Sequence, residues 1–203
     1  VDYVSATPTA PLHAVHGRGA AFGSALVNIM KAAGYEVESE YYINDAGNQI
    51  NNLAASVNAR YLELLGRPFE FPEDGYHGYD IVETAQRIID ADGDKYVQLH
   101  TKDRLNLFKE LALKEKIELL KEDLEKFNVT FDTWFSEQTL HDKNEIETSC
   151  EELAKRGYLY EKDGAKWLKS TAFGDDKDRV VIRENGVPTY LAADIAYHKD
   201  KFS

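Results

Sequence analysis

PTAPLHAVHGRGA, residues 8–20, is the stretch that decides the fold of this chain. It follows residues 3–6, a short apolar run that we expect to be a strand, and it opens a helical pattern over residues 17–33. A strand, a tight turn and a helix N-terminus form a phosphate-binding site, because unpaired backbone N–H groups and the helix dipole both point at the anion. His13 and His16 lie at this turn, where imidazoles can donate hydrogen bonds to phosphate oxygens as charge shifts in a transition state.

Other interpretations of the two histidines compete with this one, because a His-x-x-His pair alone is a weak signal. A zinc site would need a third ligand, and the single cysteine, Cys150, has no Cys-x-x-Cys partner. Capping histidines, or histidines that are simply exposed, need no ligand at all. The strand, the proline-bounded turn and the spaced glycines favour the phosphate site, and we expect no tightly bound metal or organic cofactor.

Length and composition narrow the class of protein. The 203 residues suffice for one domain with a sizeable core, or for a core with an insertion. The sequence contains no run of about 18 apolar residues, so it predicts no membrane span. It has no basic start followed by an apolar stretch, so it predicts no secretory signal. One cysteine fits a reducing, cytoplasmic location. The net charge of −12 argues against generic nucleic-acid binding. Most of the negative charge lies in residues 36–99, which contain 13 acidic and four basic residues.

A second strand is expected over residues 35–43, where Tyr and Val are enriched. Strand, helix and strand then form a βαβ unit, which is expected to be parallel and right-handed. Ligands of such open sheets bind at the carboxyl ends of the strands. Residues 5–8 and 44–45 are therefore expected along one edge of the sheet, near His13 and His16.

Further elements follow from apolar periodicity and turn signals. Helices are expected over residues 48–65, 80–91, 102–127 and 145–156, with a strand-like section over residues 129–137. Leu64 and Phe127 are expected to face the core. The helix over 102–127 has seven bases and seven acids, which we interpret as a solvent face with i,i+4 pairs. Asp163-Gly164 and Asn185-Gly186 predict two hairpins, one over residues 158–168 and one over residues 180–191.

The predicted class is α/β, an incomplete Rossmann-like nucleotide-binding fold with an inserted α+β connective region. Residues 1–66 would form the first part of the nucleotide-binding domain. Residues 67–187 would hold the helical and antiparallel insertion together with intervening elements of that domain. Residues 188–203 would return to it and end within a helical pattern.

Five segments together carry a family resemblance: DYVSA at 2–6, GRGA at 17–20, YYINDAGNQI at 41–50, FDTWFSE at 131–137 and PTYLAADIAYH at 188–198. In order and spacing they resemble class I aminoacyl-tRNA synthetases and, more narrowly, arginyl-tRNA synthetases, over nearly the whole chain. The resemblance implies activation of L-arginine with ATP, bound as its Mg²⁺ complex, followed by transfer to tRNA(Arg). We also expect a monomer with no membrane partner, since the sequence has no long apolar run.

The resemblance assigns roles to individual residues. His13 and His16 would be catalytic and contact the phosphates, and the other ATP-binding positions would be Pro8, Thr9, Ala10 and Gly17. The arginine-binding positions would be Asp2, Ser5, Thr7, His16, Tyr190 and Asp194. Asn44, Asp45 and Gln49 would contact the substrate or the tRNA end. From spacing alone, Tyr190 could equally be a core residue, Asp194 could cap a helix or face water, and Asp45 could cap the helix that follows it.

Three positions depart from the family pattern. That pattern has Gly where Ala10 and Val15 stand, and Asn where Thr7 stands. We expect the β-branched Val15 to clash with a nucleotide that approaches the backbone. The alternative is therefore a catalytically impaired relative that acts as a binding or regulatory module. A small nucleotidyltransferase would share the strand and the His-x-x-His layout, but the segments at 41–50 and 188–198 disfavour it.

The chain is expected to be a piece of a longer protein. The family's second signature loop and its anticodon-binding helices would lie beyond residue 203. We therefore expect this piece alone to be inactive, and we expect tRNA to be held mainly by parts outside it.

Overall fold

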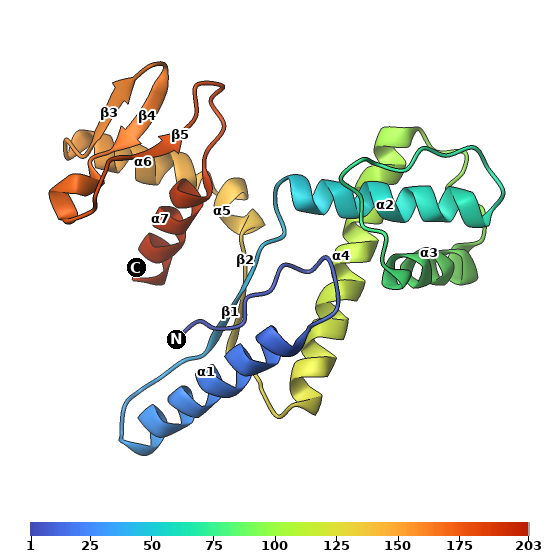
Figure 1. The fold of residues 1–203 in the computed structure, drawn as a ribbon, viewed down its shortest axis with the longest axis horizontal. Coiled ribbons are helices and arrows are strands. Elements are labelled where there is room, and N and C mark those ends of the chain that lie inside the picture. The colour runs from blue at the N-terminus through green and yellow to red at the C-terminus, as the bar shows by residue number, and fades with distance from the viewer. Residues whose placement is uncertain (203) are drawn as a thin grey trace. The chain divides into compact units, whose positions relative to one another are not determined.

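A computed structural model describes residues 1–202 in two units (Figure 1). The first unit spans Val1–Phe135 and the second begins at Ser136. This boundary coincides with neither expected segment boundary, at 66 and at 187, and the three-segment division stays a prediction. The third expected segment ends at Ser203, which lies outside the described residues.

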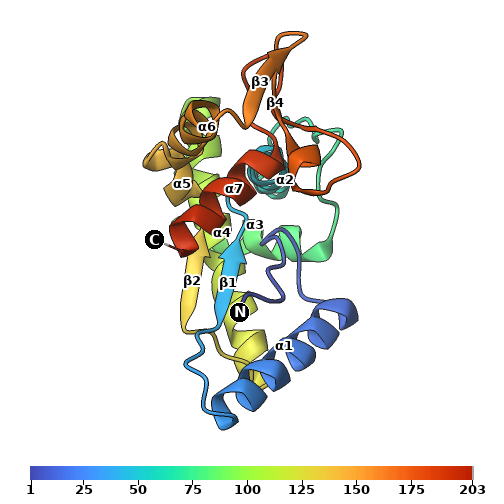
Figure 2. The ribbon, with the colours of Figure 1, turned by 90° about the vertical axis from the view of Figure 1, so that its left-hand side faces the viewer.

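The first unit contains most of the predicted helices. Its elements are α1 (Ala14–Ala32), β1 (Glu40–Ile43), α2 (Asn48–Leu64), α3 (Tyr79–Asp92), α4 (Thr101–Lys126) and β2, which starts at Thr133 and runs to Ser136. Each predicted helix is present with its ends shifted by three residues or fewer. β1 and β2 lie side by side in a two-stranded sheet (Figure 2).

Helix α1 begins earlier than expected and ends at Ala32, two residues before a glycine. Gly34 takes the left-handed conformation, with φ of 90°, just after the cap residue Ala33. The Gly34 N–H donates to the Lys31 carbonyl and the Tyr35 N–H to the Met30 carbonyl, both at 3.1 Å. This pair of bonds is a Schellman motif, which satisfies carbonyls that the helix end leaves free.

The strand expected over residues 3–6 is absent from the described residues. Only Asp2 forms a bridge, parallel to Glu40. Val4 and Ser5 then have φ of 67° and 42°, so the backbone turns away from the extended path that a strand requires. The second expected strand is likewise shortened, to β1. The α/β class is confirmed, and the parallel bridge and the β1–β2 sheet are its Rossmann-like part in the described residues.

Two apolar clusters form the core of the first unit. One joins α2, α3 and α4 and is built from Leu53, Val57, Tyr61, Ile81, Ala85, Ile88, Tyr96, Phe108 and Ala112. The other joins α1, β1 and the end of α4 and is built from Ala20, Tyr41, Ile43, Leu124 and Val129. Burial of each large side chain contributes about 1.5–3 kcal/mol. The first cluster anchors the helical insertion, and the second fixes the N-terminal segment beside β1.

Helix α4 corrects the expectation of a purely solvated charged face. Arg104 and Lys116 are only 6% and 3% exposed. Arg104 donates to the Asn58 side-chain carbonyl at 2.6 Å and to the Leu99 backbone carbonyl at 3.0 Å. Long aliphatic stems let such side chains pack inward once the charged end has partners. Leu64 and Phe127, expected in the core, are instead 42% and 54% exposed at the ends of α2 and α4.

The second unit is a three-stranded antiparallel sheet with four helical elements. They are α5 (Gln138–Asp142), α6 (Glu145–Lys155), β3 (Leu159–Lys162), β4 (Ala165–Leu168), the 3₁₀ turn η1 (Ser170–Phe173), β5 (Arg179–Ile182) and α7 (Tyr190–Lys201). The strand order is β3-β4-β5. Asp163 and Gly164 both have positive φ and join β3 to β4, which confirms the first hairpin. The second hairpin is reduced to a bridge between Ile182 and Pro188, because α7 begins at Tyr190.

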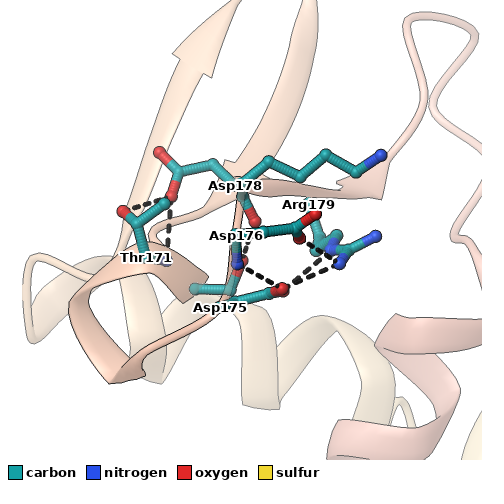
Figure 3. Close-up of polar contacts among 7 residues, drawn as sticks. Thr171, Asp175, Asp176, Asp178 and Arg179 are labelled. Carbon is teal, nitrogen blue, oxygen red and sulfur yellow. Dashed lines mark hydrogen bonds and ion pairs between the residues drawn. The ribbon is translucent and has the colours of Figure 1, made fainter.

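Carboxylates fix the connection between η1 and β5 (Figure 3). The Arg179 guanidinium donates to both oxygens of Asp175 at 2.8 Å and to Asp176 at 2.8 Å. Asp178 accepts from the backbone N–H and the hydroxyl of Thr171, at 3.1 and 2.8 Å. Hydrogen bonds from Thr171 hold the pKa of the Asp178 carboxyl below its usual value. These bonds tie the connection to Arg179, the first residue of β5.

Candidate functional site

Residues 8–20, which we call the signature stretch, contain two histidines that meet at the start of α1. His13 is the N-cap residue, with an extended backbone, and His16 lies in the first turn. The centroids of their rings are 3.8 Å apart, and the His13 backbone N–H donates to Nδ1 of His16 at 3.3 Å. Because Nδ1 accepts this bond, the neutral His16 ring carries its proton on Nε2.

The electrostatics of this helix start suit an anion. Its first turn holds no acidic side chain. Partial burial, with a smaller contribution from His13, lowers the pKa of the His16 imidazole, so the neutral form prevails near pH 7. The helix dipole and the N–H groups of the first turn supply positive potential without a formal charge.

The surface above this turn is open. Ala10 is exposed, Val15 is 59% exposed, and a Cβ added at Gly17 would meet nothing within 4 Å. Pro8 and Thr9 are instead buried. A ligand at the helix start would therefore meet exposed atoms of Ala10, Val15 and Gly17, while Pro8 and Thr9 support the turn from beneath.

A groove of about 330 Å³ lies beside His13. One side of the groove is formed at the start of α1, by Leu12, His13, Gly17 and Ala20. The other side is formed at the end of α4, by Asp123, Leu124, Lys126 and Phe127. A smaller cavity of about 200 Å³ lies on the other side of the turn, where Ala10 and Pro11 meet α3 and α4. Grooves of a few hundred cubic ångströms are the size range of small-molecule sites.

The N-terminal segment lies along β1 and carries three of the expected arginine-binding residues. Asp2 pairs with Glu40 in the parallel bridge, and Ser5 accepts a hydrogen bond from the backbone N–H of Tyr42 at 3.1 Å. The Thr7 carbonyl accepts from the Thr9 N–H at 2.8 Å. The turn that leads to His13 is thus held by backbone bonds at both ends.

Asn44, Asp45 and Gln49 surround the connection from β1 to α2. Asn44 and Asp45 are half-buried and Gln49 is exposed. The N-cap of α2 is Gly47, with φ of 83°, so Asp45 is not the residue that caps this helix. The capping interpretation of Asp45 is therefore wrong, and its role in binding stays a prediction.

Tyr190 and Asp194 lie one helical turn apart on α7, in the second unit. Tyr190 is 80% exposed, so the interpretation of this ring as a core residue is wrong. The N-cap of α7 is Thr189, and Asp194 lies within the helix with an exposed surface. Partial burial of its carboxyl raises the pKa of Asp194, while His198 opposes the shift. These two residues and the signature stretch belong to different units.

Two polar contacts near the signature stretch were not predicted from the sequence. Lys116 of α4 donates to the Asp80 carboxylate at 2.6 Å on the wall of the smaller cavity. The Tyr41 hydroxyl donates to the Ala6 carbonyl at 2.9 Å. Tyr41 stands in the YYINDAGNQI segment, and its alternation with Ile43 on a strand was the one available signal of its burial.

The described residues lack two kinds of feature, a metal-binding cluster and a membrane-spanning helix. Among residues 1–202, no group of three or more His, Cys, Asp or Glu side chains is placed to hold a metal ion. No helix in the same range is long and apolar enough to cross a membrane.

Comparisons with known proteins place these features in context. Residues 1–203 match the family described as tRNA synthetases class I (R), catalytic domain. The chain is 56% identical over 202 residues to an arginine–tRNA ligase of Carboxydothermus hydrogenoformans, and 53% identical over 201 residues to that of Bacillus subtilis. These matches cover 100% and 99% of this chain but 36% of each relative, so the chain spans about a third of their length.

Solved structures agree in fold. A Campylobacter jejuni structure described as an arginyl-tRNA synthetase superposes with a TM-score of 0.88 at 39% identity, covering 99% of this chain and 44% of that one. The arginyl-tRNA synthetase of Thermus thermophilus superposes with a TM-score of 0.65 at 24% identity, covering 97% of this chain and 34% of that one. At that lower identity the likeness concerns the fold alone.

Proposed function

The chain belongs to the class I arginyl-tRNA synthetase catalytic-domain family, and from that premise we propose that it supplies the first part of an arginine–tRNA ligase. The proposed enzyme activates L-arginine with ATP and passes the arginyl group to tRNA(Arg). ATP enters as its Mg²⁺ complex, which is substrate and not a resident cofactor. We further propose a cytoplasmic monomer whose contacts with tRNA lie mainly outside this chain.

The chemistry requires charge stabilisation at phosphate. The arginine carboxylate oxygen attacks the α-phosphorus of ATP, the bond to the bridging oxygen breaks, and pyrophosphate leaves with the electron pair. Catalysis of such a displacement rests on positioning and on donors aimed at the phosphate oxygens. The neutral His16 ring, with its proton on Nε2, is such a donor, and the N–H groups of the first turn of α1 are others.

The observation that carries the proposal is the geometry of His13 and His16. The N-cap backbone of His13 fixes the tautomer of His16 at a helix start that holds no acid in its first turn. If the two histidines only capped the helix, no open surface beside them would be required, whereas a bound ligand requires one. Here that surface contains Ala10 and Gly17, and a groove begins at His13.

Arginine recognition is proposed for two sets of residues. Asp2, Ser5 and Thr7 would meet the amino acid from the N-terminal segment. From α7, Asp194 would pair with the guanidinium, for which a carboxylate is the matching bidentate partner, and Tyr190 would stack on it. The exposed position of both α7 side chains supports this assignment. Asn44, Asp45 and Gln49 are proposed to contact the substrate or the tRNA end.

The test uses the full-length protein, by which we mean this chain continued by the remaining part of one of its bacterial relatives. With tRNA(Arg) present, we expect arginine-dependent exchange of pyrophosphate into ATP, and we expect His16→Ala to lower kcat/KM by about 10²–10³-fold, the usual effect of removing a transition-state donor. His77→Gln is the control, because His77 is exposed and stacks only on Phe71 in the insertion. Exchange that does not depend on arginine, or that survives His16→Ala, would overturn the proposal.

The second candidate is an impaired relative that binds without catalysis. Val15 favours it, since its branched side chain stands on the open surface between the two histidines. This candidate predicts that the full-length protein fails to bind ATP, which calorimetry measures directly.

A further inference from the structure

The backbone of the N-terminal segment is held in an unfavourable conformation. Val4 and Ser5 have φ of 67° and 42°, in the left-handed region that disfavours residues with a side chain and most of all a β-branched one. Two such residues in succession persist only where surrounding contacts hold them, and such positions cluster at ligand-binding sites. This segment carries Ser5 and Thr7, two of the proposed arginine-binding residues.

Strand β1 provides the contacts that hold this conformation. The Tyr41 hydroxyl donates to the Ala6 carbonyl at 2.9 Å, and the Tyr42 backbone N–H donates to Ser5 Oγ at 3.1 Å. The Ser5 N–H in turn donates to the Tyr3 carbonyl at 3.0 Å, which closes the turn locally. Two neighbouring residues of β1 therefore hydrogen-bond to Ser5 and Ala6, the two residues that precede Thr7.

Tyr41 is itself rigidly placed. Its side chain is fully buried, and its ring stacks on Trp134 with centroids 4.4 Å apart and planes 20° from parallel. Phe131 packs edge-on against the same ring at 5.3 Å. Because the ring is buried and packed against two aromatic neighbours, its hydroxyl is well placed to hold the Ala6 carbonyl. A phenylalanine would keep the ring contacts and remove only the hydrogen bond.

We propose that Tyr41 is a positioning residue for arginine binding. Its hydroxyl holds the Ala6 carbonyl and so fixes Ser5 and Thr7, on either side, in the geometry in which they meet the substrate. This proposal rests on the proposed function, because the roles of Ser5 and Thr7 come from it. It adds a residue that touches no substrate and acts through the backbone of its neighbours.

The chain offers a matched control for a purely structural role. Tyr61 is also fully buried, and its hydroxyl also donates to a backbone carbonyl, that of Gly93, at 2.9 Å. It belongs to the cluster among α2, α3 and α4 and makes no bond to residues 1–9. Tyr41→Phe and Tyr61→Phe each remove a hydroxyl from a fully buried ring, one bonded to Ala6 and one far from it. The Tyr61 hydroxyl also accepts from the Tyr96 backbone N–H at 3.3 Å, so the control loses one bond more than Tyr41→Phe does.

The experiment measures arginine-dependent pyrophosphate exchange, with tRNA(Arg) present, in the full-length protein and its two variants. We expect Tyr41→Phe to raise KM for arginine about fivefold, since a buried hydrogen bond is worth a factor of about 2 to 10 in an equilibrium constant. Tyr61→Phe should leave KM for arginine unchanged while it lowers the melting temperature at least as much as Tyr41→Phe does, because the Tyr61 hydroxyl has two backbone partners. Equal KM values in both variants would overturn the proposal.

We call the bond by which the Tyr41 hydroxyl holds the Ala6 carbonyl the clamp. Hydrogen exchange separates failure of this clamp from failure of the proposed function. If the wild-type protein shows no arginine-dependent exchange of pyrophosphate, the proposed function fails. The clamp is then judged from the amides of Ser5 and Thr9, which donate within the held segment. Faster deuterium uptake there in Tyr41→Phe, but not in Tyr61→Phe, would support the clamp. Unchanged uptake in both variants would overturn it.

Discussion

The ring of Tyr3 occupies the space that a side chain on Gly23 would need. A Cβ on Gly23 would lie far inside van der Waals contact with Cγ of Tyr3. Tyr3 also packs against Phe131, with ring centroids 4.5 Å apart. The absence of a side chain at Gly23 therefore lets α1 approach the N-terminal segment that carries Ser5 and Thr7.

Gly23→Ala should destabilise the protein by about 1–3 kcal/mol, because the added methyl group must displace the Tyr3 ring. Gly19→Ala is the matched control. It lies one turn earlier in α1, where a Cβ would meet nothing within 4 Å, so it should stabilise the helix by up to about 1 kcal/mol. Urea denaturation measures both changes. Similar effects of the two substitutions would contradict the close approach of α1 and Tyr3.

Lys116→Met should destabilise the protein by about 3 kcal/mol, because it leaves the Asp80 carboxylate without the ammonium that it pairs with at 2.6 Å. The Lys116 side chain is 3% exposed. Lys126 of the same helix has 71% of its side chain exposed, so Lys126→Met should change stability by no more than about 0.5 kcal/mol. Replacing Asp80 by Asn in the Lys116→Met background should recover part of the loss. Equal effects of the two lysine substitutions in urea denaturation would show that the buried pair contributes little.

The helices could be predicted from sequence because each buries one stripe of apolar side chains at helical spacing. In α2, Ile50, Leu53, Val57 and Tyr61 are all buried as the pattern predicts. The stripe says less about helix ends, where Leu64 loses its neighbours and becomes exposed. It also gives no sign that a lysine such as Lys116 is buried, because that depends on a partner from another helix.

The candidate site was predictable only where chemistry and local pattern coincide. His13 and His16 stand out by spacing, and α1 brings their rings together. The left-handed turn at Val4 and Ser5 was not predictable, because Val favours extended backbone and the contacts that override this preference come from β1. The bond from Tyr41 to Ala6 joins residues 35 positions apart, which no local pattern reports.

Tyr41 should make stability depend on pH in the alkaline range. Burial raises the pKa of its hydroxyl from 10.0 to about 12, against a smaller lowering effect of the bond to Ala6. A raised pKa in the folded state gives stability that is complete below pH 10 and is lost as pH rises toward 12. The difference in melting temperature between the wild type and Tyr41→Phe should therefore shrink over this window. A constant difference would mean that the hydroxyl titrates normally.

Asp178 should contribute stability that is lost in acid. Hydrogen bonds from Thr171 lower its pKa below the ordinary 3.8, so its contribution is present above that pH and disappears as pH falls through the lower folded value. Asp178→Asn cannot titrate, and its stability should fall less steeply than that of the wild type below about pH 4. Glu151→Gln, at a side chain that is 70% exposed, is the control and should follow the wild-type curve. Parallel curves for all three proteins in thermal unfolding would contradict the assignment.

Val15→Gly should strengthen ATP binding if the valine side chain occupies space that a nucleotide needs. Val15 is 59% exposed, so its removal costs little packing, and glycine in a first helical turn costs about 1 kcal/mol at most. We expect the dissociation constant for ATP to fall about tenfold, equivalent to about 1.4 kcal/mol. Ala14→Gly imposes a similar cost on the same turn at an exposed position and should leave ATP binding unchanged. Tight ATP binding by the wild type, unaltered by Val15→Gly, would instead show that a nucleotide fits beside the branched side chain, and the impaired-relative candidate would lose its main support.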